Sequence, residues 1–118
     1  MAASHKPVED PAFDPKFLDT YTGGDKAIRN QVLELFLEQA SLLLDRLYEA
    51  RGDAKAWHAA AHSLKGCAGG VGASGVADLA RLAEQRSAET DDIHIKTIRD
   101  LRSALAATAE KVREVLAS

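Results

Sequence analysis

"AAHSLKGCAGGVGASG", residues 60–75, places one histidine and five glycines in a segment that otherwise favours a helix. Each glycine in a helix interior costs about 1 kcal/mol relative to alanine, so Gly66, Gly69 and Gly70 together cost about 3 kcal/mol of helix preference. A cost of this size indicates that something offsets it and that small residues are needed on this surface. They would allow the close approach of another backbone or of a partner.

The composition is that of one soluble globular domain. The chain has 118 residues, of which 46% are hydrophobic and 28% charged, and a chain of this size buries a single core. Its formal net charge is −3. This balance disfavours nucleic-acid binding and a polybasic membrane anchor, because both usually need a basic patch.

Targeting and redox features favour a cytoplasmic location. No apolar run approaches the roughly 20 residues of a membrane-spanning helix. The N-terminal MAASHKPVEDPAF lacks the apolar segment of a secretory signal. Cys67 is the single cysteine, so an internal disulfide is excluded and the chain is not a disulfide-stapled secreted scaffold.

Helical spacing of apolar residues continues through most of the chain, and no alternating strand pattern occurs. We expect a loose tail over residues 1–12 and a short helix from Asp14 to Tyr21. Four long helices should follow. The first is capped by Asp25 and ends at Arg51-Gly52, the second runs from the cap Asp53 to Gly72, the third starts at the cap Ser74, and the fourth follows a turn around Thr90-Asp91-Asp92.

Each long helix has an apolar face that should enter the core. The predicted core residues are Ile28, Val32, Leu35, Phe36, Leu43 and Leu47, then Trp57, Ala61, Leu64, Ala68 and Val71, then Val76, Leu79, Ala80, Leu82 and Ala83, and finally Ile98, Leu101, Leu105, Val112 and Val115 or Leu116. Short connections make sequential helices antiparallel neighbours. We therefore predict an all-α fold over residues 13–118, an antiparallel up-down-up-down four-helix bundle with the short N-terminal helix across one end.

A second stripe accompanies the apolar face of the glycine-rich helix. It contains His58, His62, Lys65 and Gly69, displaced by one position from the core face. His62 and Lys65 are three residues apart, so their side chains are neighbours on the helix surface. We expect this stripe at the edge of the buried face or in solvent.

These residues carry a resemblance to a known family. "AHSLKGCAGGVGA" is similar to the signature of histidine-containing phosphotransfer (HPt) domains, with a histidine, a lysine three positions later and a glycine after it. "FDPKFLDTYTGGDKAIRNQVLELFLEQA", "LYEARGDAKAWHAAAHSLKG" and "VADLARLAEQ" resemble the segments around that signature. The resemblance covers about residues 13–90, whereas the last helix matches only as a generic amphipathic segment.

The resemblance implies a function for several positions. HPt domains carry a phosphoryl group between receiver-domain aspartates and have no kinase activity of their own. His62 would be the phosphoacceptor, Lys65 would lie beside the phosphoryl group, and Gly66 would leave room for the receiver. In the family a glutamine or glutamate on the next helix often orients the histidine ring. Glu84 and Gln85 both fit that role by spacing.

The chemistry of the histidine agrees with this role. An unperturbed imidazole has a pKa of about 6.5, so much of it is neutral and nucleophilic at neutral pH. An acceptor on one ring nitrogen would direct the other nitrogen outward, and a lysine ammonium can balance part of the phosphoryl charge. We expect no cofactor on this chain, with Mg²⁺ only on the partner receiver.

Partners should be receiver domains of a hybrid histidine kinase and of response regulators, with the chain itself a monomer. From the predicted faces, the expected receiver contacts are Leu35, Gln39, His58, Ser63, Gly69 and Gly70. The initial methionine and the tail favour a free-standing protein, although a fragment of a hybrid kinase would look almost the same. The cognate kinase and regulator are not determined by the sequence.

Other interpretations of the same residues are weaker. His58 and His62 have a spacing seen in metal sites, but no third ligand is evident. We interpret Cys67 as a small buried apolar residue and His5 and His94 as incidental, and the glycines could also serve tight helix packing. The competing function is a helical adaptor that binds partners without phosphorylation. Labelling of His62 separates the two, because only a carrier needs it.

Overall fold

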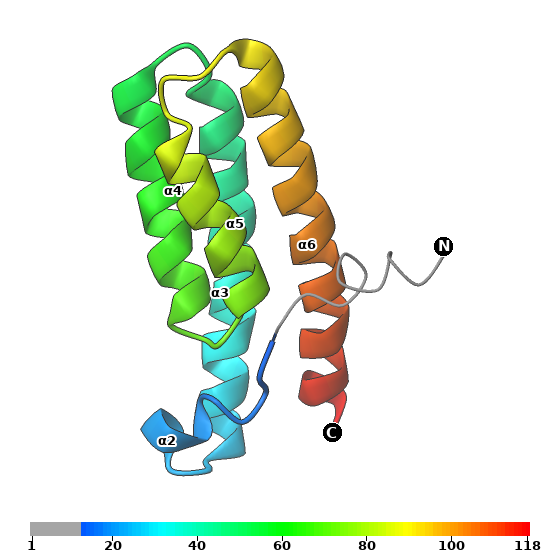
Figure 1. The fold of residues 1–118 in the computed structure, drawn as a ribbon. Coiled ribbons are helices and arrows are strands. Elements are labelled where there is room, and N and C mark those ends of the chain that lie inside the picture. Colours follow the sequence, from blue (N-terminus) through cyan, green and yellow to red (C-terminus); the bar gives the residue numbers. More distant parts are fainter. Residues whose placement is uncertain (1–12) are drawn as a thin grey trace.

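The computed structural model describes residues 13–118, and over that range the chain forms helices and no strands. The helices are α2 (Asp19–Thr22), α3 (Lys26–Glu49), α4 (Ala54–Gly69), α5 (Ser74–Gln85) and α6 (Asp91–Ala117). The four longer helices lie side by side, with α2 at one end of the bundle (Figure 1). The tail predicted over residues 1–12 lies outside the described residues.

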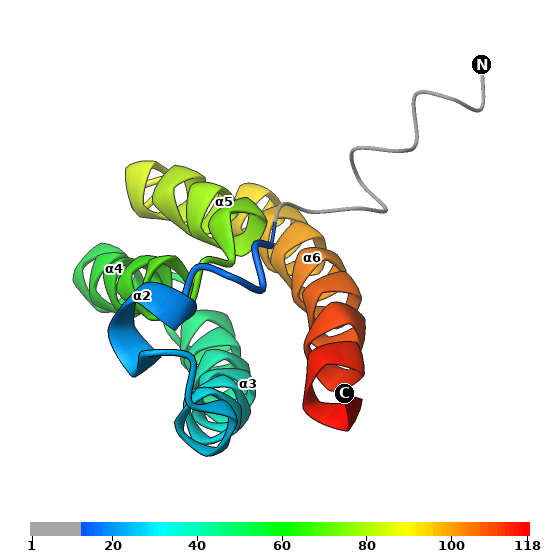
Figure 2. The same cartoon turned by 90° about the horizontal axis from the view of Figure 1, so that it is seen from below.

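Each of the four longer helices packs against two others. The α3 helix contacts α4 and α6, and α5 contacts the same two helices, as the end-on view shows (Figure 2). The α3–α4 and α5–α6 connections lie at one end of the bundle and the α4–α5 connection at the other (Figure 1). The all-helical class predicted from the apolar spacing is therefore confirmed for residues 13–118.

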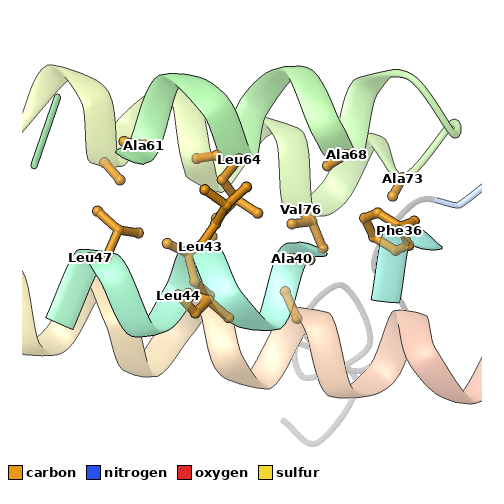
Figure 3. Close-up of a cluster of buried hydrophobic side chains, with 14 of the residues drawn as sticks. Phe36, Ala40, Leu43, Leu44, Leu47, Ala61, Leu64, Ala68, Ala73 and Val76 are labelled. Carbon is orange, nitrogen blue, oxygen red and sulfur yellow. The ribbon is translucent and has the colours of Figure 1, made fainter. Parts of the chain in front are cut away.

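The core is built mainly from leucine on α3 and small residues on α4. All five apolar residues predicted for the glycine-rich helix are buried, namely Trp57, Ala61, Leu64, Ala68 and Val71. Of these, Ala61, Leu64 and Ala68 lie opposite a face of α3 that includes Phe36, Leu43 and Leu47 (Figure 3). Alanines at 61 and 68 allow α3 and α4 to approach closely, so the outer face of α4 is held in a fixed orientation.

Two residues predicted for the core of α3 are exposed instead. Ile28 is 46% exposed and Leu35 is 55% exposed. Each residue turns an α-helix by about 100°, so Leu35 lies about a quarter-turn from Phe36, beyond the edge of the buried face. Leu82 on α5 is likewise on the solvent side, at 37% exposure. Ile28 and Leu35 are seven residues apart, a spacing that keeps both near the apolar face of the helix without placing them in it.

Two of the three predicted helix caps are confirmed. The Asp25 carboxylate accepts hydrogen bonds from the backbone N–H groups of Ala27 and Ile28, at 2.9 and 3.1 Å. The Asp53 carboxylate accepts one from Ala56 at 3.0 Å. The prediction for Ser74 is wrong, because Ser74 is the first residue of α5 and the buried Ala73 occupies the cap position without a side-chain cap bond.

The predicted boundaries of three helices need correction. The short N-terminal helix spans Asp19–Thr22 rather than Asp14 to Tyr21, because the Asp14 carboxylate accepts from the Lys16 N–H at 3.0 Å and closes a turn there. The α3 helix ends at Glu49, before the predicted Arg51-Gly52. The α4 helix ends at Gly69, and turns carry the chain on through Gly72.

His94 is not incidental, contrary to the sequence-based interpretation. It is 1% exposed, and its ring stacks on Trp57 with centroids 3.6 Å apart. Its Nε2 lies 2.8 Å from the Arg86 carbonyl oxygen, to which it donates, and the Trp57 indole N–H donates to the Ala83 carbonyl at 2.6 Å. The pair therefore joins α4, α5 and α6. His5 lies outside the described residues.

Gly72 ties the N-terminal segment to the α4–α5 connection. Its φ is +81°, and a Cβ at this position would lie 2.6 Å from Cβ of Phe17. The Asp14 N–H also donates to the Gly72 carbonyl at 3.1 Å. Gly52 has a similar φ of +87°, but its Cβ would meet nothing within 4 Å. The two glycines thus share a left-handed backbone conformation and differ in how crowded their surroundings are.

This pair yields a matched stability prediction. Gly52→Ala should lower the free energy of unfolding by about 1–2 kcal/mol through left-handed backbone strain alone. Gly72→Ala should cost about 1–3 kcal/mol more, because the new methyl group collides with Phe17. Urea unfolding of both variants measures the difference. Equal losses would contradict the proposed packing of the N-terminal segment on Gly72.

Candidate functional site

The site is formed where the outer edge of α4 faces α5. His58, His62 and Lys65 follow one another on α4 at helical spacing, and Glu84 lies near the end of α5. The buried Ala80 and Ala83 hold α5 against the core, which turns the next side chain, Glu84, toward α4. The His62 side chain remains 64% exposed, whereas that of Glu84 is only 14% exposed.

Glu84 accepts contacts from all three basic side chains. Its Oε2 lies 2.8 Å from Nδ1 of His62 and 3.2 Å from Nε2 of His58. Its Oε1 lies 2.8 Å from Nζ of Lys65. One carboxylate therefore connects three residues of α4 to α5, and both of its oxygens are engaged.

The electrostatics of this cluster keep Glu84 ionised. The hydrogen bond from Lys65 and then that from His62 lower the pKa of the Glu84 carboxyl below its ordinary value of 4.5. An ionised carboxylate only accepts hydrogen bonds, so Nδ1 of His62 is the donor in the contact with Glu84. A neutral His62 ring then carries its proton on Nδ1 and leaves a free lone pair on Nε2. The exposed ring can offer this lone pair to an electrophile.

The structure shows which of Glu84 and Gln85 contacts His62, a choice that the sequence spacing left open. Glu84 contacts His62, whereas Gln85 is exposed and makes no hydrogen bond to His58 or His62 within the described part of the chain. Adjacent helix residues point about 100° apart, so only one of the two can face α4. The roles assigned to His62, Lys65 and Glu84 remain predictions from the family resemblance.

The glycines of α4 have open space around them. A Cβ added at Gly66 or Gly69 would meet nothing within 4 Å, and one at Gly70 would lie 3.3 Å from the Gly66 carbonyl oxygen. Gly66 and Gly69 are therefore not required for packing between helices of this chain. Because glycine has no side chain, the surface beside His62 is flatter than it would be with other residues.

The predicted receiver contacts all lie at the surface. Leu35, Gln39, His58, Ser63, Gly69 and Gly70 are exposed. On the side of α4 away from Glu84, an open groove of about 380 Å³ runs between α3 and α4, with Leu43 and Arg46 on one wall and Ala59 and Ser63 on the other. His58 differs from the rest of the set, because its ring nitrogen is engaged by Glu84.

Three further observations on residues 13–118 concern metal binding, the cysteine and membrane insertion. Within that range no group of three or more histidine, cysteine, aspartate or glutamate side chains is arranged to hold a metal ion. Cys67 is half-buried, and this burial raises the pKa of its thiol above 9.0. None of the described helices is both long and apolar enough to cross a membrane.

Comparison with known protein families identifies the class. A family model described as "Hpt domain" matches residues 31–114, so the chain belongs to the Hpt family. The match includes His62 and Glu84 and extends through most of α6. Hpt domains are phosphocarrier modules rather than enzymes, act by histidine phosphotransfer in phosphorelays, and bind receiver domains of kinases and response regulators. Searches of curated proteins and of solved structures find no match.

The lowered pKa of Glu84 predicts a pH-dependent contribution to stability. The folded state holds the Glu84 proton less tightly than the unfolded state, so ionised Glu84 stabilises the fold above pH 4.5, and this is lost as the pH falls through the lowered pKa. Glu84→Gln should therefore be less stable than wild type above pH 4.5 and approach it on further acidification. Urea unfolding of both proteins across this range tests the prediction, and a pH-independent difference would contradict it.

Proposed function

We propose that this protein is a phosphorelay carrier that accepts a phosphoryl group on Nε2 of His62 from one receiver aspartate and donates it to another. The observation that carries this proposal is the contact of Nδ1 of His62 with Glu84 at 2.8 Å, on a side chain that is 64% exposed. This contact holds the ring from its inner side and leaves Nε2 toward solvent. A reactive nitrogen and a fixed ring are what a phosphoacceptor needs.

The transfer step balances without an external acid or base. The lone pair of His62 Nε2 attacks the phosphorus of the receiver's aspartyl phosphate, and the N–P bond forms as the P–O bond to the aspartate breaks. The bonding electrons leave with the aspartate carboxylate, and the His62 proton stays on Nδ1. Positive charge that develops on the ring faces the ionised Glu84, which stabilises it.

Lys65 supplies a second charge at the same place. Its side chain is 34% exposed and its Nζ lies 2.8 Å from Glu84, so the ammonium can reach the phosphoryl oxygens by turning outward about its flexible stem. There it would balance part of the phosphoryl charge. Any Mg²⁺ that assists the transfer would belong to the receiver domain.

The receiver would dock over α4 and the adjoining face of α3. Gly66 lies one turn after His62 with open space where a side chain would be, so the receiver's active-site loops can approach Nε2. Leu35 and Leu42 are exposed on α3, at 55% and 48%, and supply apolar area beside the α3–α4 groove. Ser63 lies on the α4 wall of that groove.

The remaining parts of the proposal follow from the class. We take the antiparallel up-down-up-down order of the four long helices as the frame for the site, within a single domain of residues 13–118. The protein would act as a cytoplasmic monomer without kinase activity of its own. Hybrid-kinase receivers would load it and response-regulator receivers would unload it. The alternative is an adaptor that binds partners without phosphorylation, and it does not require a fixed orientation of the His62 ring.

Substitution of the acceptor tests the proposal. His62→Gln should abolish transfer from a phosphorylated receiver, while the helical circular dichroism stays at the wild-type level because His62 is exposed. Transfer is measured with a receiver labelled on its aspartate. Retained transfer to the variant would remove His62 as the acceptor, and absence of transfer to wild type from every receiver tried would favour the adaptor.

Gly66 offers a test that separates docking from stability. Gly66→Ala should raise the free energy of unfolding by about 0.5–1 kcal/mol, because alanine is the better helix former and the site has room for the methyl group. Gly66→Leu should keep the fold but lower the rate of receiver transfer at least tenfold, because its side chain stands between His62 and the receiver (about 1.4 kcal/mol of lost interaction). Wild-type transfer rates for Gly66→Leu would contradict the role of Gly66 in docking.

A further inference from the structure

We propose that His58 is a positioning residue for His62, which holds the Glu84 carboxylate in place when Lys65 turns to the phosphoryl group. The sequence predicts that His58 contacts the partner receiver. Its ring also makes an internal contact, with Nε2 at 3.2 Å from Oε2 of Glu84. The kinetic consequences of this inference rest on the proposed phosphocarrier function, whereas its structural consequences do not.

The two histidines use opposite ring nitrogens on the same oxygen. His58 lies one helical turn before His62 on α4, and their rings are nearly parallel, with 7° between the planes and 6.2 Å between the centroids. His58 contacts Oε2 through Nε2, and His62 contacts it through Nδ1. Only the His62 contact has the alignment of a hydrogen bond, whereas His58 lies within ion-pair distance of the carboxylate without that alignment. A ring nitrogen this close to an ionised carboxylate carries a hydrogen, so Nε2 of His58 and Nδ1 of His62 are both protonated. The free lone pairs are then on Nδ1 of His58 and Nε2 of His62.

The need for a second anchor arises from the position of Lys65. Among the described residues, Oε1 of Glu84 is bound by Lys65 alone, and Lys65 is the charge that the phosphoryl group would attract. When the ammonium turns outward, Glu84 loses its strongest partner. A carboxylate with His62 as its single remaining donor is free to rotate, and the His62 ring loses its fixed orientation with it.

His58 can keep Glu84 in place after Lys65 leaves, because the contact between His58 and Glu84 does not involve the phosphoryl group. The Nε2–H group of His58 is attracted by charge to the negative Oε2, which lies 3.2 Å from Nε2. With His58 in place, Glu84 keeps the N–H groups of both rings beside Oε2 throughout the transfer, and Nδ1 of His62 keeps its acceptor. The His58 side chain is 56% exposed, so its replacement should not disturb the core.

Three variants separate this role from the alternatives. His58→Phe keeps a flat ring and removes the donor. His58→Gln keeps a donor, because the glutamine amide nitrogen reaches nearly the same place as the histidine Nε2. Lys55→Gln is the control, since Lys55 is exposed on the same helix and has no part in the site. Circular dichroism of all three checks the fold.

Two readouts are taken on each variant. The first is the ¹⁵N chemical shifts of the His62 ring nitrogens near neutral pH, which report the fraction of the ring with its proton on Nδ1. The second is the rate of His62 phosphorylation by phosphoramidate, a partner-free donor whose P–N bond breaks with release of ammonia. Because no receiver is present, an effect on docking cannot change this rate.

His58→Phe should lower the fraction with the proton on Nδ1 and slow phosphorylation about three- to tenfold, a loss below the worth of one charge-assisted hydrogen bond. His58→Gln should restore both to within about twofold, a difference well below the worth of one hydrogen bond, and Lys55→Gln should match wild type. Unchanged ¹⁵N shifts in His58→Phe would overturn the inference, and so would failure of His58→Gln to restore them. If wild-type His62 is not phosphorylated at all, the carrier function fails, while the ¹⁵N shifts still decide whether His58 positions the ring.

Discussion

The contact between the Glu84 carboxylate and Nδ1 of His62 is the interaction on which the site depends. It joins α4 to α5 at the surface, and Lys65 completes it from the other carboxylate oxygen at 2.8 Å. The low pKa of Glu84 keeps the carboxylate charged, and the charge assigns the His62 proton to Nδ1. In the proposed function, this contact makes the exposed side chain of His62 an oriented nucleophile, with its free lone pair directed away from the bundle.

Packing in the bundle makes this contact possible because it fixes the rotation of α4 and α5 about their axes. Small residues such as Ala61 and Ala68 bring α4 close to α3, and the stacked pair of Trp57 and His94 joins α4 to α6 next to the end of α5. The outer face of α4 is left with few bulky side chains, since Gly66 and Gly69 do not pack within this chain. Hpt domains bind receiver domains, and we propose that this open surface is where a receiver docks.

Much of the fold follows from the sequence, because the apolar stripe of α4 and the caps Asp25 and Asp53 are local patterns. The residues at the edges of helix faces do not, and so the spacing of Ile28 and Leu35 wrongly placed them in the core. His94 was missed since its burial depends on Trp57, which is distant in sequence. His62 and Lys65 stand out in the motif, whereas the contact of Glu84 rather than Gln85 depends on the rotation of α5 about its axis.

The most direct test of the account is to incubate the protein with phosphoramidate and map the product by mass spectrometry and by ¹⁵N–³¹P correlation. The account predicts phosphorylation of His62 alone, with the N–P bond at Nε2. His58 and the buried His94 serve as internal controls in the same molecule. Equal modification of His58, modification of His62 at Nδ1, or no modification of His62 would contradict the claim that Glu84 orients this histidine as a phosphoacceptor.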